Sequence, residues 1–329
     1  LFVLMAYGQE KKFALYSVAF YNMENLFDTI HDEGKNDYEY LPNGTNQWNT
    51  MKYKAKLKNM SEILSLLSTD KLPMGPAIIG VSEIENYRVL EDILKQPALA
   101  DRGYQYVHYE GEDQRGVDCA FFYNPKLFEL TNSKLVPYVY INDTIHKTRG
   151  FLIASGNIAG EKMHFIVNHW PSRAAASPAR ERAGEQVRAI KDSLLREDSA
   201  AKIVIMGDMN DDPMDKSMAV ALGAKRKPAD VGPTDLYNPW WDTLKKGYGT
   251  LMYKGKWNLF DQIVFTGNLL GTDRSTLKFY KHEIFRRDFM FQKEGKYKGY
   301  PKRTQAGGVW LNGYSDHLPT IIYLIKEMK

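Results

Sequence analysis

The chain has very little cysteine: Cys119 is the single one among 329 residues, so no intrachain disulfide can form. Unpaired cysteines are among the most buried residue types, and we therefore interpret Cys119 as a small apolar core residue. The sequence also contains no HExxH motif and no set of thiolates. These absences argue against a structural zinc site and against a zincin-type metalloprotease.

Long hydrophobic runs are missing as well. No stretch approaches the roughly 18 apolar residues that a membrane-spanning helix needs, so we predict no transmembrane segment. Residues 1–8 read LFVLMAYG, an apolar stretch followed by small residues before a polar segment. We interpret residues 1–8 as the remnant of a secretory signal peptide and predict a periplasmic or secreted protein. The alternative is a buried first strand.

Charge of one sign is not in large excess, because 44 basic and 40 acidic residues leave a net charge of +4. This balance tolerates an anionic substrate but lacks the strong basic excess of a dedicated duplex-binding protein. The segment 281–303 is more basic than the rest of the chain. It contains eight basic and three acidic residues, with aromatic residues between them. Such a segment is typical of a rim that contacts phosphates or bases. The alternative is a solvated loop that its aromatic residues hold in place.

Repeats, low-complexity tracts and Pro/Gly/Ser-rich linkers are also absent, so we interpret residues 9–329 as a single domain. Apolar, β-rich runs predict strands at 13–21, 77–81, 104–109, 117–123, 151–158, 163–167, 203–206, 262–265 and 318–324. Two apolar stripes with steps of three and four predict packing helices. The stripes consist of Tyr53, Leu57, Met60, Leu64 and Leu67, and of Ala179, Ala183, Val187, Ile190 and Leu194.

Polar side chains follow several of these apolar runs directly. Carboxylates and a histidine in such places are costly to bury unless they are paired or bind a metal. Several together indicate a shared polar pocket at one edge of a sheet. The oxygen-rich set fits a hard cation such as Mg²⁺, with Mn²⁺ as an alternative. Its members are Asn22, Glu83, His169, Asp208 with Asn210, Asp261, and Asp316 with His317.

The motifs around these residues resemble those of the endonuclease/exonuclease/phosphatase family, also called deoxyribonuclease-I-like, and of its secreted bacterial branch in particular. GDxN or SDH alone occurs by chance, but six motifs in family order across residues 22–317 are specific. They are the strand-ending Asn22, Glu83 after IIGVS, the histidine of VNHWPSR, GDMNDDP, FDQIVF and SDHLP. The resemblance implies an α/β fold, a four-layered sandwich of two mixed β-sheets flanked by helices.

The resemblance also implies a role for each motif residue. Glu83 would bind Mg²⁺, with Asn22 and Asp316 alongside. Asp208 and His317 would jointly activate the attacking water, and Asn210 would hold a phosphate oxygen. His317 would contact the scissile phosphate and be oriented by Asp261, whereas His169 would bind or protonate the phosphate side. Arg173, Arg115 and Asp118 lie where the family often contacts substrate.

Elementary electrostatics agrees with these roles. The anionic oxygens of a phosphate ester repel a nucleophile, and a metal ion with a protonated histidine stabilises the charge of the transition state. Some assignments keep alternatives. Glu85, two residues after Glu83, is a rival metal ligand. Glu24 is either a supporting group or a surface acid, and Arg173 either binds phosphate or pairs with an acid.

The substrate is less well defined, because function on such folds depends on loops. We interpret the protein as a phosphodiester-cleaving enzyme, with nucleic acid as the favoured substrate. The alternatives are a lipid phosphodiesterase of the sphingomyelinase type and a small-molecule phosphodiesterase or phosphatase. A binding protein without turnover would lack a metal or base residue, and none is missing here. The sequence indicates no protein partner.

Overall fold

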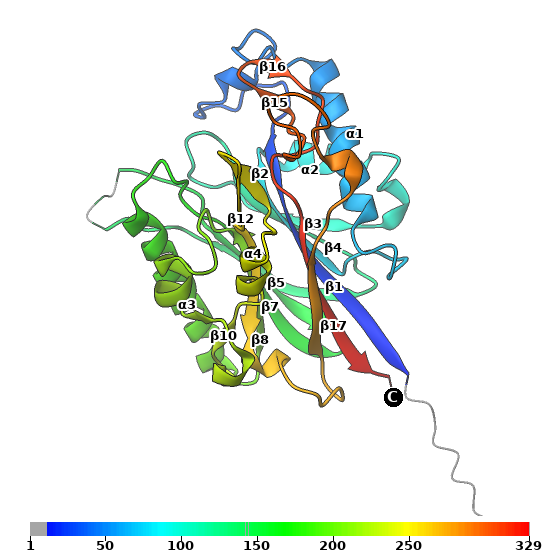
Figure 1. Ribbon diagram of the computed structural model, residues 1–329, viewed down its shortest axis with the longest axis vertical. Helices are drawn as coiled ribbons and strands as arrows, with labels where there is room; N and C mark the ends of the chain where they lie inside the picture. The colour runs from blue at the N-terminus through cyan, green and yellow to red at the C-terminus, as the bar shows by residue number, and fades with distance from the viewer. Residues whose placement is uncertain (1–11, 142, 144, 329) are drawn as a thin grey trace, which may run out of the picture.

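The computed structural model describes residues 12–141, 143 and 145–328, so the predicted signal remnant, residues 1–8, lies outside the described residues. Two mixed sheets face each other and carry helices on their outer sides (Figure 1). The first sheet has the order β14 (Lys278–Ile284), β17 (Thr320–Glu327), β1 (Phe13–Leu26), β2 (Ile78–Ile84), β4 (Asp118–Tyr123), β3 (Gln105–His108). The four-layered sandwich implied by the resemblance is therefore confirmed.

The second sheet has seven strands in the order β5 (Phe128–Val136), β6 (Phe151–Ile158), β7 (Glu161–His169), β8 (Lys202–Asp208), β13 (Asp261–Thr266), β10 (Leu236–Tyr237), β9 (Ala224–Lys225). Two short hairpins stand apart from the sheets. They are β11 (Leu251–Tyr253) with β12 (Lys256–Asn258), and β15 (Gln305–Ala306) with β16 (Val309–Trp310). The α-helices are α1 (Thr50–Leu66), α2 (Tyr87–Leu94), α3 (Ser177–Glu197) and α4 (Trp241–Lys245).

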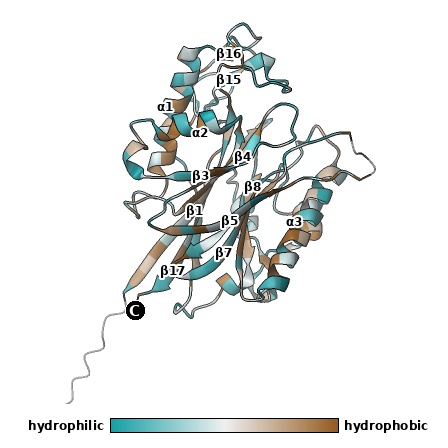
Figure 2. Ribbon diagram, turned by 180° about the vertical axis from the view of Figure 1, so that it is seen from behind, coloured by the Kyte–Doolittle hydropathy of each residue, from teal (hydrophilic) through white to brown (hydrophobic). Residues whose placement is uncertain are grey.

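The central strands are buried on both faces, which explains their continuous apolar runs. In β2, Ile78 faces the core between the sheets, whereas Ile79 packs in the cluster that contains α1 and α2. In β8, Val204 faces the central core and Ile205 packs in the cluster with α3. Figure 2 shows mixed hydrophobic and hydrophilic colouring along α3. Helix α3 is thus amphipathic, as its sequence predicts.

All nine predicted strands and both predicted helices are present, and Cys119 is buried as expected. The sequence did not indicate β5, whose residues are largely half-buried or exposed, nor the eight-residue helix α2. Helix α2 starts at Asn86, whose side chain accepts hydrogen bonds from the N–H groups of Arg88 and Val89. Among the described residues, no helix combines the length and the apolar character that crossing a membrane requires.

The stability of this fold should fall at acid pH through His282 in β14. Its ring lies 4.8 Å from that of Trp240, its Nε2 lies 2.9 Å from Thr243 Oγ1, and burial lowers its pKa to about 4. The unfolded chain binds a proton near pH 6.5, so stability is lost as the pH falls from about 6.5 to about 4. The free energy of unfolding, measured by urea titration, should fall less between about pH 6.5 and about pH 4 in His282→Gln than in the wild type. We expect the difference to be roughly 1–3 kcal/mol. An unchanged pH slope would contradict this prediction.

Candidate functional site

The predicted polar residues converge where the strands of both sheets end. In the second sheet, the parallel pairing of β7 with β8 sets His169 opposite Asp208, and the antiparallel pairing of β8 with β13 sets Asp261 opposite Asp208. The first sheet contributes Asn22 from β1 and Glu83 from β2, which run parallel. The topology therefore brings five residues that are far apart in the sequence to one end of the sandwich.

The strands β1 and β2 are irregular at this end. Their register shifts between Asn22 and Leu26, and Glu24, Asn25 and Glu83 have positive φ values of 46°, 52° and 58°. Left-handed conformations of non-glycine residues cost about 1–3 kcal/mol each and are concentrated at functional sites. Bulges of this kind re-aim side chains next to active sites. Here the Glu83 carboxylate accepts hydrogen bonds from Asn22 Nδ2 (3.1 Å) and from the N–H of Asn25 (3.0 Å).

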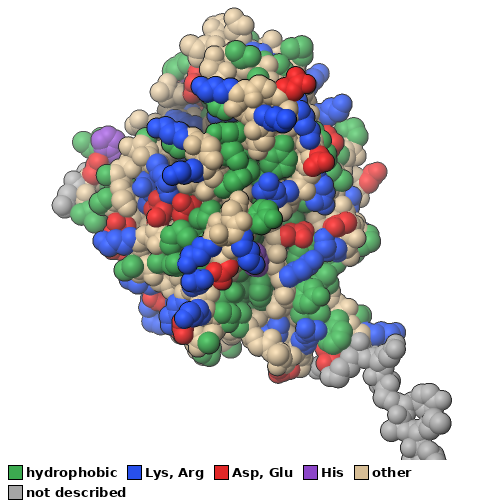
Figure 3. All heavy atoms as spheres, in the orientation of Figure 1, with side chains coloured by type: hydrophobic (Ala, Val, Ile, Leu, Met, Phe, Trp, Pro, Cys, Tyr) green, Lys and Arg blue, Asp and Glu red, His purple; other side chains and the backbone are tan. Residues whose placement is uncertain are grey.

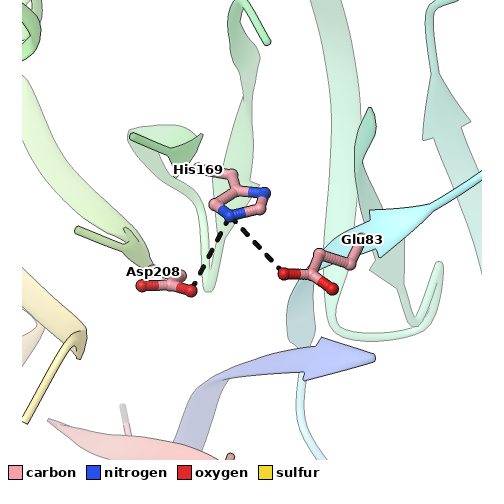
Figure 4. A group of neighbouring side chains, drawn as sticks. All are labelled: Glu83, His169 and Asp208. Carbon is pink, nitrogen blue, oxygen red and sulfur yellow. Dashed lines mark ion pairs between the residues drawn. The ribbon is translucent and has the colours of Figure 1, made fainter. Parts of the chain in front are cut away.

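Glu83, His169 and Asp208 form a cluster of potential metal ligands (Figure 4). His169 Nε2 lies 3.6 Å from Glu83 Oε1 and 3.8 Å from Asp208 Oδ2. Asn22 Nδ2 donates to both carboxylates, at 3.1 Å and 3.0 Å. No lysine or arginine of the described chain forms an ion pair with either carboxylate. Two carboxylates and an imidazole that no lysine or arginine neutralises fit a divalent cation such as Mg²⁺ or Mn²⁺.

Asn22 meets this cluster with its amide nitrogen, because its Oδ1 accepts a hydrogen bond from the N–H of Glu24 at 2.8 Å. In this orientation it holds the two carboxylates in place. It would have to present its oxygen to be the metal ligand that the family resemblance implies.

The two histidines of the site have opposite protonation. Burial lowers the pKa of His169 well below its usual value, and nearby Arg149 and Arg115 lower it further, so this ring is neutral. Burial also acts to lower the pKa of His317, but the charges of Asp261 and Asp208 outweigh it and hold that pKa well above the usual value. His317 is therefore an imidazolium whose Nδ1 donates to Asp261 Oδ2 at 2.7 Å.

Asp208 lies between these two rings. Burial raises the pKa of its carboxyl to about 7, and the positive charge of His317 counteracts this. The N–H of Asn210 donates to Asp208 Oδ1 at 2.9 Å, and His317 Nε2 lies 3.8 Å from Asp208 Oδ2. A carboxylate whose pKa is close to neutrality suits a general base.

The remaining predicted site residues have other partners. Asn210 donates through Nδ2 to the carbonyl of Trp170 at 3.0 Å. Asp316 pairs through Oδ2 with Arg303 Nη2 at 2.9 Å, and its Oδ1 lies 4.0 Å from His317 Nε2. Exposed Arg115 donates to Asn25 Oδ1 at 2.7 Å, so it lies beside the cluster.

Arg173 and Asp118 are tied to structural partners. Arg173 pairs with Asp215 at 2.9 Å and lies over the Phe260 ring at 4.4 Å. Asp118 lies 3.2 Å from His108 Nε2 and accepts from the N–H of Gly111. Sequence reasoning assigned no role to His108, because no motif surrounds it.

Two basic residues support the site from behind; the sequence gave Lys56 no role and included Arg303 only in the basic segment 281–303. Arg303 donates to Glu24 Oε1 at 2.9 Å and also holds Asp316. Lys56 is completely buried in α1, lies 3.9 Å from Glu24 Oε2, and donates to the carbonyl of Tyr314 at 2.6 Å. The signal for Lys56 was its position, three residues after Tyr53, on the apolar side of its helix. Glu24, for which the sequence left two interpretations, is thus a buried supporting group.

Replacing Lys56 should destabilise the protein without a change at its surface. Lys56→Met leaves Glu24 with one cationic partner and removes one of the two donors to the carbonyl of Tyr314, the other being Thr304 Oγ1 at 3.2 Å. We expect the free energy of unfolding to fall by roughly 3 kcal/mol in urea titrations. Lys58→Met, at an exposed position of the same helix, should change it by less than about 0.5 kcal/mol. Equal effects of both variants would refute this account of Lys56.

Several solved structures share this fold. An endonuclease/exonuclease/phosphatase family protein from Bacteroides thetaiotaomicron has a similar structure, with 15% identity, a TM-score of 0.59 and 97% of each chain covered. A mannosyl-6-phosphatase from the same organism has 14% identity and a TM-score of 0.57, with 94% of this chain and 99% of that chain covered. A humanised D. rerio TDP2 has 14% identity and a TM-score of 0.57, with 94% of this chain and 98% of that chain covered.

No curated protein sequence matches the chain. The sequence model described as "Endonuclease/Exonuclease/phosphatase family" matches residues 17–326, which includes every residue of the site. The chain therefore belongs to the endonuclease/exonuclease/phosphatase family.

Proposed function

We propose that this protein hydrolyses phosphate esters with water and a divalent cation. The observation that carries the proposal is the cluster of Glu83, His169 and Asp208, which lies beside the cationic ring of His317. All activities in the family's name break phosphate ester bonds. This arrangement supports the proposal, because the carboxylate of Asp208 and the cationic ring of His317 lie side by side, with Nε2 at 3.8 Å from Oδ2.

The residues of the chain have separate roles in this proposal. Glu83 would hold the cation, and Asp316 would offer a second oxygen through Oδ1, since Arg303 pairs with its Oδ2. The bound cation would neutralise phosphate oxygens and lower the barrier to attack. Asp208 removes a proton from the attacking water, because its pKa lies near neutrality.

The histidines act on the phosphate. His317 donates through Nε2 to a phosphate oxygen, and Asp261 fixes the ring by accepting from Nδ1. We assign neutral His169 to the phosphate side, and Asn210 to a further oxygen through the N–H of Nδ2 that is not donated to the carbonyl of Trp170. These roles agree with the protonation of the two histidines, since burial and nearby arginines lower the pKa of His169, whereas Asp261 and Asp208 raise the pKa of His317.

The proposal predicts hydrolysis that depends on metal. We expect p-nitrophenyl phosphate or bis-p-nitrophenyl phosphate to be hydrolysed with Mg²⁺ or Mn²⁺, and EDTA to abolish the reaction. Added Mg²⁺ should restore it. Hydrolysis that persists in EDTA, or bound metal without turnover of any phosphate ester, would overturn the proposal.

Nucleic acid is the substrate that the sequence favours, in part because residues 281–303 combine basic and aromatic side chains. Several cations of that segment contact aromatic or acidic groups of the chain itself. Arg286 lies over Trp257 and Phe291 at 4.9 Å and 5.0 Å, and Arg287 lies over Phe285 at 4.1 Å. Figure 3 shows Lys and Arg interspersed with Asp and Glu on this face. This mixed charge favours the second candidate, a small phosphate ester, because long polyanions bind to continuous basic surfaces.

A further inference from the structure

A cavity of about 400 Å³ borders the proposed metal centre. This volume is within the range of roughly 300–1,000 Å³ that is usual for small-molecule sites. Its walls include Glu24 and Asn25, and the N–H of Asn25 donates to Glu83 Oε2 at 3.0 Å. Arg303, which holds Asp316, is also part of the wall. A molecule in this cavity would therefore lie directly beside the catalytic cluster.

Three polar side chains from separate segments line the cavity. They are Glu39 in the 3-10 helix η1 (Tyr38–Tyr40), Asn46 before α1, and Gln305 in β15. None of the three forms a side-chain hydrogen bond or ion pair with another described residue. Carboxylate and amide groups of this kind donate to and accept from hydroxyl groups. Their convergence gives the cavity several unused hydrogen-bonding positions.

Aromatic side chains form the apolar part of the wall. Tyr40 and Trp48 are buried and pack edge to face at 5.9 Å, and exposed Tyr297 contributes from the opposite segment. Figure 1 shows the β15–β16 hairpin next to the segment that precedes α1. A site with aromatic faces and scattered polar groups suits a ring with apolar C–H faces and a hydroxylated edge.

The charges of the cavity exclude a second phosphate group. Glu24 and Glu39 are acidic, and the one arginine of the wall, Arg303, is paired with Glu24 at 2.9 Å and with Asp316 at 2.9 Å. An anionic group in the cavity would meet carboxylates without a free cation. An uncharged group with hydroxyls would not.

We propose that this cavity binds the uncharged, polyhydroxylated part of a sugar phosphate while the phosphate lies at the Glu83 cluster. The inference rests on the proposed function and names its substrate class. In the reaction, water adds its OH to phosphorus as the ester P–O bond breaks. The sugar oxygen receives the remaining proton, which yields a free sugar and inorganic phosphate.

The test compares three substrates: a hexose 6-phosphate, p-nitrophenyl phosphate and single-stranded DNA. The wild-type enzyme should have its highest kcat/KM for the hexose phosphate. In the double variant Asn46→Ala/Gln305→Ala, the ratio of kcat/KM for the hexose phosphate to that for p-nitrophenyl phosphate should fall about 10- to 100-fold. Each lost hydrogen bond contributes roughly 3- to 10-fold. Asn132→Ala, at an exposed position of β5, should leave the ratio unchanged.

Two further measurements protect the test against a misfolded variant. The thermal midpoint of the double variant is compared with that of the wild type, and Glu39→Gln provides a conservative variant whose ratio should also fall. Free hexose should inhibit wild-type hydrolysis of p-nitrophenyl phosphate competitively.

An unchanged ratio in folded variants, or a preference for DNA, overturns the sugar proposal while phosphoester hydrolysis stands. No turnover of any of the three substrates with bound Mg²⁺ would instead overturn the proposed function, and the sugar proposal with it.

Discussion

Replacement of His317 by alanine should lower kcat for p-nitrophenyl phosphate by about 10³-fold, since removal of one preorganised donor to a developing charge costs 10²–10³-fold and a full positive charge is lost here as well. The acidic neighbours Asp261 and Asp208 hold His317 as an imidazolium, so the wild-type enzyme offers this charge throughout the neutral pH range. Steady-state kinetics at saturating Mg²⁺ gives the comparison.

The matched control is His146→Ala, because His146 is an exposed histidine with Asp143 as its partner at 2.6 Å. This variant should retain the wild-type kcat. The His317→Ala protein should also remain folded, as judged by its circular dichroism spectrum. A folded His317→Ala enzyme with near wild-type turnover would show that His317 does not act on the phosphate.

The two sheets could be predicted because their strands are buried on both faces and therefore read as continuous apolar runs. The motif residues could be predicted because a carboxylate or histidine directly after such a run is costly unless it serves a site. Strands with an exposed face, such as β5, carry a mixed pattern that does not separate them from loops.

The geometry of the site could not be predicted in the same way. The left-handed backbone at Glu24, Asn25 and Glu83 is opposed by local preference and exists only because the surrounding sheets enforce it. Part of the support from Lys56 and Arg303 depends on contacts between distant parts of the chain, since Lys56 and Thr304 are 248 positions apart and Arg303 and Glu24 are 279 apart. The spacing of motifs along the sequence does not predict such contacts.

The partners of charged residues could not be predicted from the sequence either. Arg173 ends the VNHWPSR motif, and the sequence left open whether it binds phosphate or pairs with an acid; it lies 2.9 Å from Asp215 and donates to the carbonyl of Asn210. Its charge holds the loop after β8 in place. Whether a cation near a site faces substrate or protein is decided by the fold, so its position in a motif is a weak guide.

Glu83 and Glu85 provide the sharpest test of the proposed metal site, because they are two residues apart and both are glutamates. The Glu83 carboxylate faces His169 and Asn22 in the cluster. The Glu85 carboxylate accepts from the N–H of Asp28 at 2.7 Å instead, and burial, together with the charge of Asp28, raises its pKa to about 9. Glutamine at position 85 would therefore resemble the neutral acid that is already there.

We expect Glu83→Gln to lower kcat/KM by more than about 100-fold at subsaturating Mg²⁺, because a neutral amide replaces a charged ligand of a hard cation. Higher Mg²⁺ concentrations should restore part of the activity, which separates weakened metal binding from a damaged base. Glu85→Gln should stay within about twofold of the wild type at every Mg²⁺ concentration, since glutamine keeps the shape of the neutral acid and an acceptor for the N–H of Asp28. The opposite pattern, with Glu85 essential and Glu83 dispensable, would move the metal centre to the other glutamate and contradict the site described above.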